Sequence, residues 1–169
     1  KEGSNLVITG RNEARLLEAK KKLEEGYGVK VLALVADGAD EVKIKEVIAK
    51  TVDTFGKINT LINNAQTSKS GLSLIEHTKE DFDLAINSGL YATFFYMKEA
   101  FPYLKESKGS VINFASGAGL FGKLGQSSYA AAKEGIRGLS RVAAAEWGPD
   151  GVRANIIAPL AMTESLTEW

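Results

Sequence analysis

The sequence has no cysteine, a single histidine and no net charge. Without cysteine, the chain can form neither disulfides nor thiolate zinc sites, and it has no cysteine nucleophile. Basic and acidic residues balance at 21 each, so no overall field attracts nucleic acid or an anionic membrane. No apolar run approaches the roughly 18 residues of a membrane span, and the first residues do not resemble a signal peptide. We therefore expect a soluble, cytoplasmic protein with no nucleic-acid and no membrane partner.

The 169 residues are 44% hydrophobic, which suits one α/β domain over residues 1–169 with a real core. Short β-rich apolar runs alternate with longer helical patterns, and this order predicts a parallel sheet with crossover helices. We expect strands at 5–9, 29–36, 60–63, 110–115 and 153–157. We expect helices at 12–25, at 41–55, from the capping box at Thr78 to about 105 with an irregular turn at 87–89, and around Tyr129 up to Trp147. Residues 117–125 are expected to form a glycine-rich loop.

Tyr129 and Lys133 lie four positions apart in a predicted helix, and Ser116 follows an apolar strand thirteen residues upstream of Tyr129. This spacing places the two helical side chains on one face, so the ammonium can lie close to the phenol. A nearby positive charge favours the phenolate and suits the phenol to general acid and base catalysis. The alternative interpretation is an alanine-rich surface helix that carries a tyrosine and a lysine by chance.

Four motifs in order resemble those of the short-chain dehydrogenase/reductases of the classical type. They are Asn63-Asn64-Ala65-Gln66, Ile112 to Ser116, Tyr129-Ala-Ala-Ala-Lys133, and Asn155 to Pro159. Within the family, the sequence looks closest to 3-oxoacyl-carrier-protein reductases and sugar-alcohol dehydrogenases. The resemblance implies a Rossmann-type, doubly wound parallel sheet that binds NAD(H) or NADP(H), and a reaction that interconverts a carbonyl and an alcohol by hydride transfer.

The resemblance also implies roles for the three residues singled out above. Tyr129 would be the general acid during carbonyl reduction and the base in the reverse direction. Lys133 would support Tyr129 and hydrogen-bond the nicotinamide ribose, since an ammonium has three donors. Ser116 would hydrogen-bond the substrate oxygen and stabilise charge that develops there.

The residue at the end of the strand at 5–9 predicts the choice of cofactor, because an acidic residue there would accept hydrogen bonds from the ribose of NAD. Gly10 stands at that place, and the adjacent Arg11 can pair with a 2′-phosphate, so NADP(H) is preferred and NAD(H) is the alternative. Arg11 can also simply begin a solvated helix. The resemblance further implies that Asp37 contacts adenine, that Asn64 lies against the adenosine ribose, and that Thr163 meets the nicotinamide amide.

The sequence departs from the family pattern at the fourth catalytic position, an asparagine that holds a relay water near the lysine. Counting along the long helix puts Gly89 there, with Asn87 two residues earlier. A backbone carbonyl, a water or Asn87 from a shifted turn would then serve. Gln66 replaces a family glycine and is expected to be structural or solvent-facing, and His77 is expected on a loop surface rather than as a ligand or base. No metal site can be assembled.

The glycine-rich first turn that holds the pyrophosphate in this family is not found, and neither are the final helices and strand. With the usual strand order, the strands at 5–9 and 60–63 would face each other across a gap. Two alternatives therefore remain open: a truncated, non-catalytic binding or oligomerisation module, and an epimerase or dehydratase of the same fold. The substrate stays open among small metabolites, sugars, acyl thioesters and steroid-like rings. The resemblance implies a homodimer or homotetramer.

Overall fold

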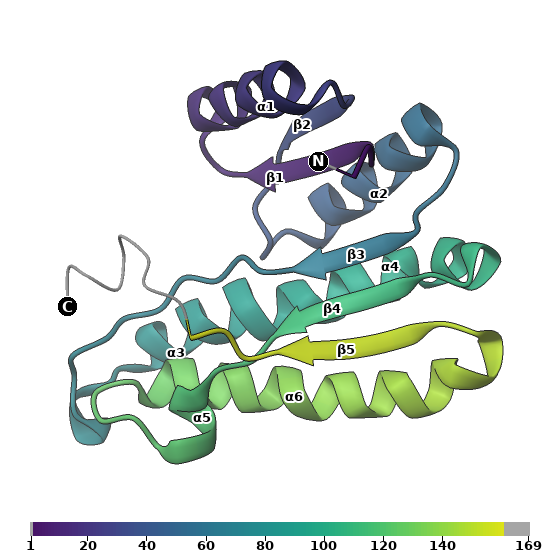
Figure 1. Ribbon diagram of the computed structural model, residues 1–169. Coiled ribbons are helices and arrows are strands. Elements are labelled where there is room, and N and C mark those ends of the chain that lie inside the picture. Colours follow the sequence, from purple (N-terminus) through teal and green to yellow (C-terminus); the bar gives the residue numbers. More distant parts are fainter. Residues whose placement is uncertain (1, 161–169) are drawn as a thin grey trace.

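The structure is a computed structural model that describes residues 2–160, and it is an α/β fold of the Rossmann type (Figure 1). The described strands form two parallel sheets. The first sheet pairs β1 (Leu6–Gly10) with β2 (Val31–Val35). The second has the order β3 (Thr60–Asn63), β4 (Ser110–Phe114) and β5 (Arg153–Ile157). β1 and β3 are not hydrogen-bonded to each other, as the sequence predicted.

Helices α1 (Glu13–Tyr27) and α2 (Glu41–Phe55) follow β1 and β2, and both have capped ends. The side chain of Asn12 accepts a hydrogen bond from the Arg15 amide at the start of α1, and Asp40 caps α2 in the same way. Such caps satisfy amide groups that have no partner within the helix. Gly28 and Gly56 end the two helices with positive φ angles, where glycine carries no steric penalty.

The predicted long helix is divided into three parts. A short turn, η1 (Leu74–Glu76), precedes α3 (Lys79–Ala85), which begins at the predicted capping box of Thr78 and Asp81. A π-helical segment, η2 (Ile86–Tyr91), then leads into α4 (Ala92–Ser107). The irregular turn predicted at 87–89 therefore lies within a π segment, a form often found at functional sites.

The glycine-rich segment 117–125 is not wholly a loop, which corrects the sequence prediction. Ser116 caps a short helix, α5 (Gly117–Phe121), and Gly122 ends it with a φ of 71°. The prediction failed because glycines and a short length argue against a helix, whereas the serine cap and packing of α5 against α6 (Ser127–Trp147) favour one. A short turn, η3 (Gly148–Asp150), connects α6 to β5.

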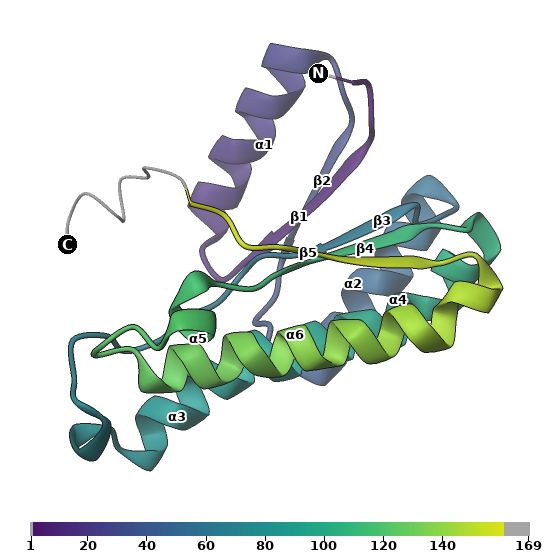
Figure 2. The ribbon, with the colours of Figure 1, turned by 60° about the horizontal axis from the view of Figure 1, so that its bottom comes forward.

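Helices α2, α4 and α6 lie along one face of the β3-β4-β5 sheet, and α1 lies on the other side of the molecule against β1 and β2 (Figure 2). The main core lies between this sheet and the helices. Its buried members are Ile48, Ile58, Met97, Ala100, Leu104, Val111, Ala143 and Val152. This core holds β3, β4, β5, α2, α4 and α6 together, and predicted site residues lie beyond the carboxyl ends of β3 and β4 and in the first turns of α6.

A buried polar link runs through this core. The Asn113 side chain is fully buried, accepts a hydrogen bond from the Asn63 amide at 2.8 Å, and donates to Ser140 Oγ at 2.8 Å. Buried polar groups are stable only when they are paired. The link therefore sets the relative position of β3, β4 and α6 at the depth where the site begins.

Candidate active site

Ser116 lies two residues beyond the end of β4, where the chain turns into α5. Its Oγ accepts a hydrogen bond from the Ala118 amide at 3.1 Å. Because a hydroxyl has one donor and two acceptor positions, this contact leaves the hydroxyl proton available to a ligand. The capping role therefore orients Ser116 without consuming its donor.

Lys133 lies within α6 and its side chain is buried, with only 4% of the residue exposed. Its Nζ donates a hydrogen bond to the Phe114 carbonyl at 2.8 Å, which fastens α6 to the end of β4. Burial disfavours the charged form, and this desolvation lowers the pKa of Lys133 from 10.5 to about 8. The lysine is thus a buried ammonium that can exchange a proton close to neutral pH and has two further donors to offer.

Tyr129 lies one helical turn before Lys133 and is partly exposed. The Lys133 Nζ lies 5.5 Å from the centroid of the tyrosine ring, over its face, in a cation–π contact. The structure thus brings Tyr129 and Lys133 together, as their spacing predicted. It also joins Lys133 to Phe114, two residues before Ser116.

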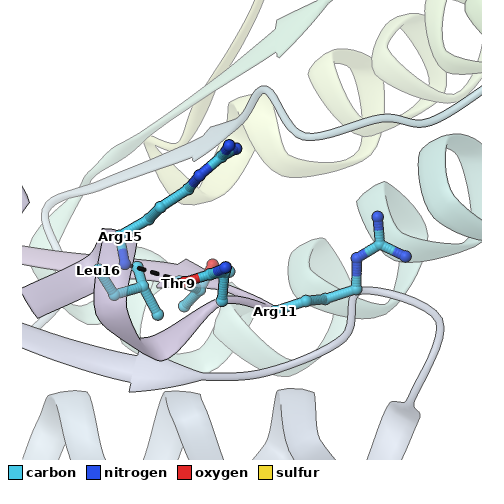
Figure 3. A pocket seen from close by; sticks show the side chains of 6 residues that line it. Thr9, Arg11, Arg15 and Leu16 are labelled. Carbon is cyan, nitrogen blue, oxygen red and sulfur yellow. Dashed lines mark hydrogen bonds between the residues drawn. The ribbon is translucent and has the colours of Figure 1, made fainter.

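A hollow lies at the end of β1. It is lined by Thr9, Gly10, Arg11, Asn12, Arg15 and Leu16. Figure 3 shows Arg11 and Arg15 extending from this turn with their guanidinium groups apart from each other. Arg11 is exposed, which agrees with both roles that the sequence left open for it, a phosphate contact and the start of a solvated helix. Arg15 was not singled out from the sequence. Its position four residues later on the first turn of α1 could have revealed it.

The other predicted cofactor residues lie at strand ends on the same side. Asp37 follows β2, is exposed, and accepts a hydrogen bond from the Ala39 amide at 3.0 Å. Asn64 follows β3 directly and is also exposed. Both are therefore open to a ligand along the carboxyl edge of the strands, where nucleotides bind in open α/β sheets. Thr163 lies outside the described residues.

Gln66 is not solvent-facing, in contrast to one of the alternatives that the sequence left open. Its two amide atoms are buried and have no hydrogen-bond partner among the described residues. The side chain packs over Gly89 in η2, where an added Cβ would lie 2.6 Å from Gln66 Cδ. Asn87 is exposed. The volume that a residue-89 side chain would fill is therefore taken by Gln66, which the sequence could not reveal because the two residues are 23 positions apart.

His77 is not a simple surface residue either. Its Nδ1 lies 2.9 Å from Ser127 Oγ, at the first residue of α6, and 3.1 Å from the Ser73 carbonyl. Its ring also meets that of Phe82 edge-on. His77 thus connects the segment before α3 to the start of the helix that carries Tyr129, a contact over 50 positions that no local pattern signals.

Among residues 2–160 no group of three metal-ligating side chains comes together. Within the same residues no helix has the length and apolar character needed to cross a membrane.

Comparison with known proteins identifies relatives of the chain. A family model described as short chain dehydrogenase matches residues 1–168. The chain is 62% identical over 173 aligned residues to a 12alpha-hydroxysteroid dehydrogenase of Clostridium sp., covering all of this chain and 67% of that protein. It is 36% identical to a 3-oxoacyl-[acyl-carrier-protein] reductase of Thermotoga maritima, covering 96% of this chain and 68% of that protein.

Solved structures give the same result. The crystal structure of levodione reductase matches with a TM-score of 0.90 at 33% identity, and the match covers 94% of this chain. An NAD+-bound xylitol dehydrogenase matches with a TM-score of 0.89 at 26% identity. The chain spans 62% and 61% of these two structures, so it corresponds to less than two thirds of their length.

The parallel strands, crossover helices and polar residues at the strand ends define an α/β fold of the dinucleotide-binding type. The family match over residues 1–168 and the 62% identical relative define the group more narrowly. The chain belongs to the short-chain dehydrogenase family, whose relatives given above are named dehydrogenases and reductases.

Proposed function

We propose that the protein is an NADP(H)-dependent oxidoreductase that interconverts a carbonyl and a secondary alcohol, with Tyr129 as the general acid and base. The observation that carries this proposal is the cluster at the end of β4. There the buried Lys133 ammonium is fixed by the Phe114 carbonyl at 2.8 Å and lies over the Tyr129 ring. Burying an ammonium is costly, and such a cost is usual where a charge serves chemistry.

The chemistry of the proposed reduction divides between the cofactor and the protein. A bound nicotinamide supplies the hydride for the carbonyl carbon. Tyr129 donates its phenolic proton to the carbonyl oxygen, while the hydroxyl of Ser116 donates a hydrogen bond to the same oxygen. Lys133 holds positive charge beside the tyrosine and thereby stabilises the phenolate that remains. In the oxidation direction, Tyr129 takes the proton from the alcohol.

The described residues fit a nicotinamide dinucleotide. Arg11 and Arg15 line the hollow at the end of β1, where no acidic residue is present. Guanidinium groups form stronger, charge-assisted hydrogen bonds with a phosphate dianion than with the neutral hydroxyl pair of an unphosphorylated ribose. We therefore assign the 2′-phosphate of NADP(H) to this hollow, with Asp37 and Asn64 beside the adenosine portion and Tyr129 and Lys133 beside the nicotinamide portion. For Thr163, which lies outside the described residues, the proposed contact with the nicotinamide amide rests on the family resemblance alone.

A hydroxysteroid or the corresponding oxosteroid is the proposed substrate. The 62% identical relative is named a 12alpha-hydroxysteroid dehydrogenase. The segments that flank Ser116 and Tyr129 also carry large exposed apolar side chains: Leu120 is 57%, Phe121 83% and Leu124 94% exposed. An apolar ring system would cover such side chains, whereas a sugar or another small polar metabolite would not.

We also propose that the protein forms a homodimer or homotetramer in the cytoplasm. An apolar groove lies between α4 and α6 and is lined in part by Phe94, Val142 and Trp147. Phe94 is 39% and Val142 52% exposed. A second copy of the same two helices would bury this groove.

The test combines cofactor binding with turnover. Nicotinamide fluorescence should show tighter binding of NADPH than of NADH, and a panel of ketones should show NADPH oxidation with an oxosteroid. Tyr129→Phe should lower kcat by at least about 100-fold, since general acid catalysis contributes 10²–10⁴-fold, with NADPH affinity retained. Net NADPH consumption separates this function from an epimerase. Binding of neither cofactor, or full turnover by Tyr129→Phe, would overturn the proposal.

A further inference from the structure

Two segments far apart in the sequence are fastened together next to Tyr129. The first comprises residues 70–78, which lie between β3 and α3, and the second comprises residues 122–127, which follow α5 and end with the first residue of α6. Both views of the ribbon show these two segments side by side beyond the end of the sheet (Figures 1 and 2). We call this connection the latch, and it has two points of contact.

The first point is a close approach of two backbones. The Gly71 amide donates a hydrogen bond to the Gly125 carbonyl at 2.8 Å. A Cβ on Gly125 would lie 3.2 Å from the Gly71 Cα, and Gly125 has a φ of 73°. Only glycine meets both demands without strain. The close approach therefore requires glycine at position 125.

The second point is the His77 ring, whose Nδ1 lies 2.9 Å from Ser127 Oγ. Ser127 is the first residue of α6, two positions before Tyr129. Nδ1 also lies 3.1 Å from the Ser73 carbonyl, so one or other hydrogen bond is available in either ring tautomer. Phe82 packs edge-on against the ring and holds its orientation. His77 thereby couples the position of the first segment to that of the catalytic helix.

The two segments of the latch carry large exposed apolar side chains. Leu74 is 71% and Ile75 93% exposed on the first segment, while Leu124 is 94% exposed on the second. Large apolar side chains that are exposed on two fastened segments indicate a surface for an apolar ligand. A fused ring system held at Ser116 and Tyr129 extends further from these two residues than a small ketone does.

We propose that His77 is a positioning residue for the substrate: through Ser127 it holds residues 70–78 as one wall of the site for the distal rings of a steroid. This inference rests on the proposed function. His77 does not touch the reacting atoms. It acts on substrate affinity rather than on proton transfer, and it has no part in binding the nucleotide at the end of β1.

The test is a double-mutant cycle with His77→Phe, Ser127→Ala and the combined variant. His77→Phe keeps a ring against Phe82 and removes Nδ1, and Ser127→Ala removes the same hydrogen bond from the other side. Thr78→Ala is the matched control, because it removes the adjacent α3 cap and leaves the latch intact. Each variant is assayed with an oxosteroid and with cyclohexanone, alongside NADPH affinity and the melting temperature.

Each single variant should raise the KM for the oxosteroid about 3- to 10-fold, the size expected for one hydrogen bond. Its kcat, its KM for cyclohexanone and its NADPH affinity should stay within about twofold of wild type, the pattern of lost ground-state binding. The combined variant should be no worse than the worse single variant, because both remove one interaction. Should His77→Phe fail to fold, Ser127→Ala alone decides.

Four results would overturn the inference. They are an unchanged steroid KM, an equal rise in the KM for cyclohexanone, an equal rise in Thr78→Ala, and additive effects in the combined variant, which would contradict a shared contact. Failure of the proposed function gives different results. Either the wild-type protein would turn over neither ketone, or the Tyr129→Phe variant would keep full activity.

Discussion

The two sheets of the molecule differ in how they are supported. The β3-β4-β5 sheet rests on α2, α4 and α6 over a continuous apolar core, and the Asn113 link runs through it. The β1-β2 pair is covered by α1, in which Leu16 is the buried residue among those described. The proposed catalytic side chains stand on the well-packed unit, where geometry must hold. The arginines proposed to select the nucleotide, Arg11 and Arg15, lie on the smaller unit of β1, β2 and α1, where they line an open hollow that a phosphate can enter.

The largest expected effect is on stability, and it should differ between the apolar cores of the two units. Leu104→Ala should lower the free energy of unfolding by about 2–5 kcal/mol, because Leu104 is fully buried in the main cluster. Leu16→Ala should lower it by about 1–2 kcal/mol, because α1 packs against one pair of strands and can adjust. Urea unfolding measures both. Equal losses would contradict the difference between the units.

Lys133 lies in the β3-β4-β5 unit, and we expect its buried ammonium to reduce the stability of that unit. Lys133→Met should raise the free energy of unfolding at pH 7 by about 1–2 kcal/mol, the desolvation cost less the lost bond to Phe114. Turnover should fall by at least about 100-fold. Such gains at the expense of activity are common at functional sites. If Lys133→Met were less stable than wild type, the expectation that burial of the Lys133 ammonium destabilises the fold would be wrong.

The pH dependence of stability gives a separate check on Lys133. The pKa in the folded protein is about 8 and lies below the ordinary 10.5. The unfolded chain therefore binds more protons between these values, and the free energy of unfolding should rise as the pH increases from about 8 to about 10.5. Plots of the free energy of unfolding against pH should therefore differ in slope between wild type and Lys133→Met in this pH range. Parallel plots would exclude a contribution of Lys133 to the pH dependence of stability.

The unit of β1, β2 and α1 should determine whether the protein prefers NADPH or NADH. Arg11→Ala should weaken NADPH binding about tenfold, the loss of one charge-assisted contact, and should leave NADH binding nearly unchanged. Arg15→Ala provides the companion measurement on the other side of the hollow. Fluorescence titration with both nucleotides measures the ratio. A parallel loss for NADH would assign these arginines to the pyrophosphate or to structure instead.

The smallest effect is expected on the exposed face of α1. Lys22 and Glu18 form an ion pair at 2.7 Å, and both side chains are mostly exposed. The pKa of Glu18 is lowered by its hydrogen bond to Lys22. Lys22→Ala should nevertheless leave the urea midpoint unchanged within error, since exposed pairs contribute little. A clear loss would show that α1 depends on its surface charges more than on packing.

Local patterns were sufficient for most of the fold. The helix at 41–55 and the strands at 60–63 and 153–157 were predicted with their observed ends, because caps, glycines and apolar periodicity act within a few residues. The helix α5 was missed, since its glycines outweigh the serine cap in any local reading. The pairing of Tyr129 with Lys133 was predicted because one helical turn relates them.

What the sequence by itself determined is therefore the order of elements, the parallel sheet, the family and the Tyr129 and Lys133 pair. Tertiary structure alone decided that Phe114 fixes the ammonium, that Gln66 fills the space over Gly89, and that His77 reaches Ser127. The reason is physical. Helix turns, caps and alternation arise from neighbours along the chain, whereas these contacts join residues 19 to 50 positions apart. They exist only once the sheet and its helices have packed.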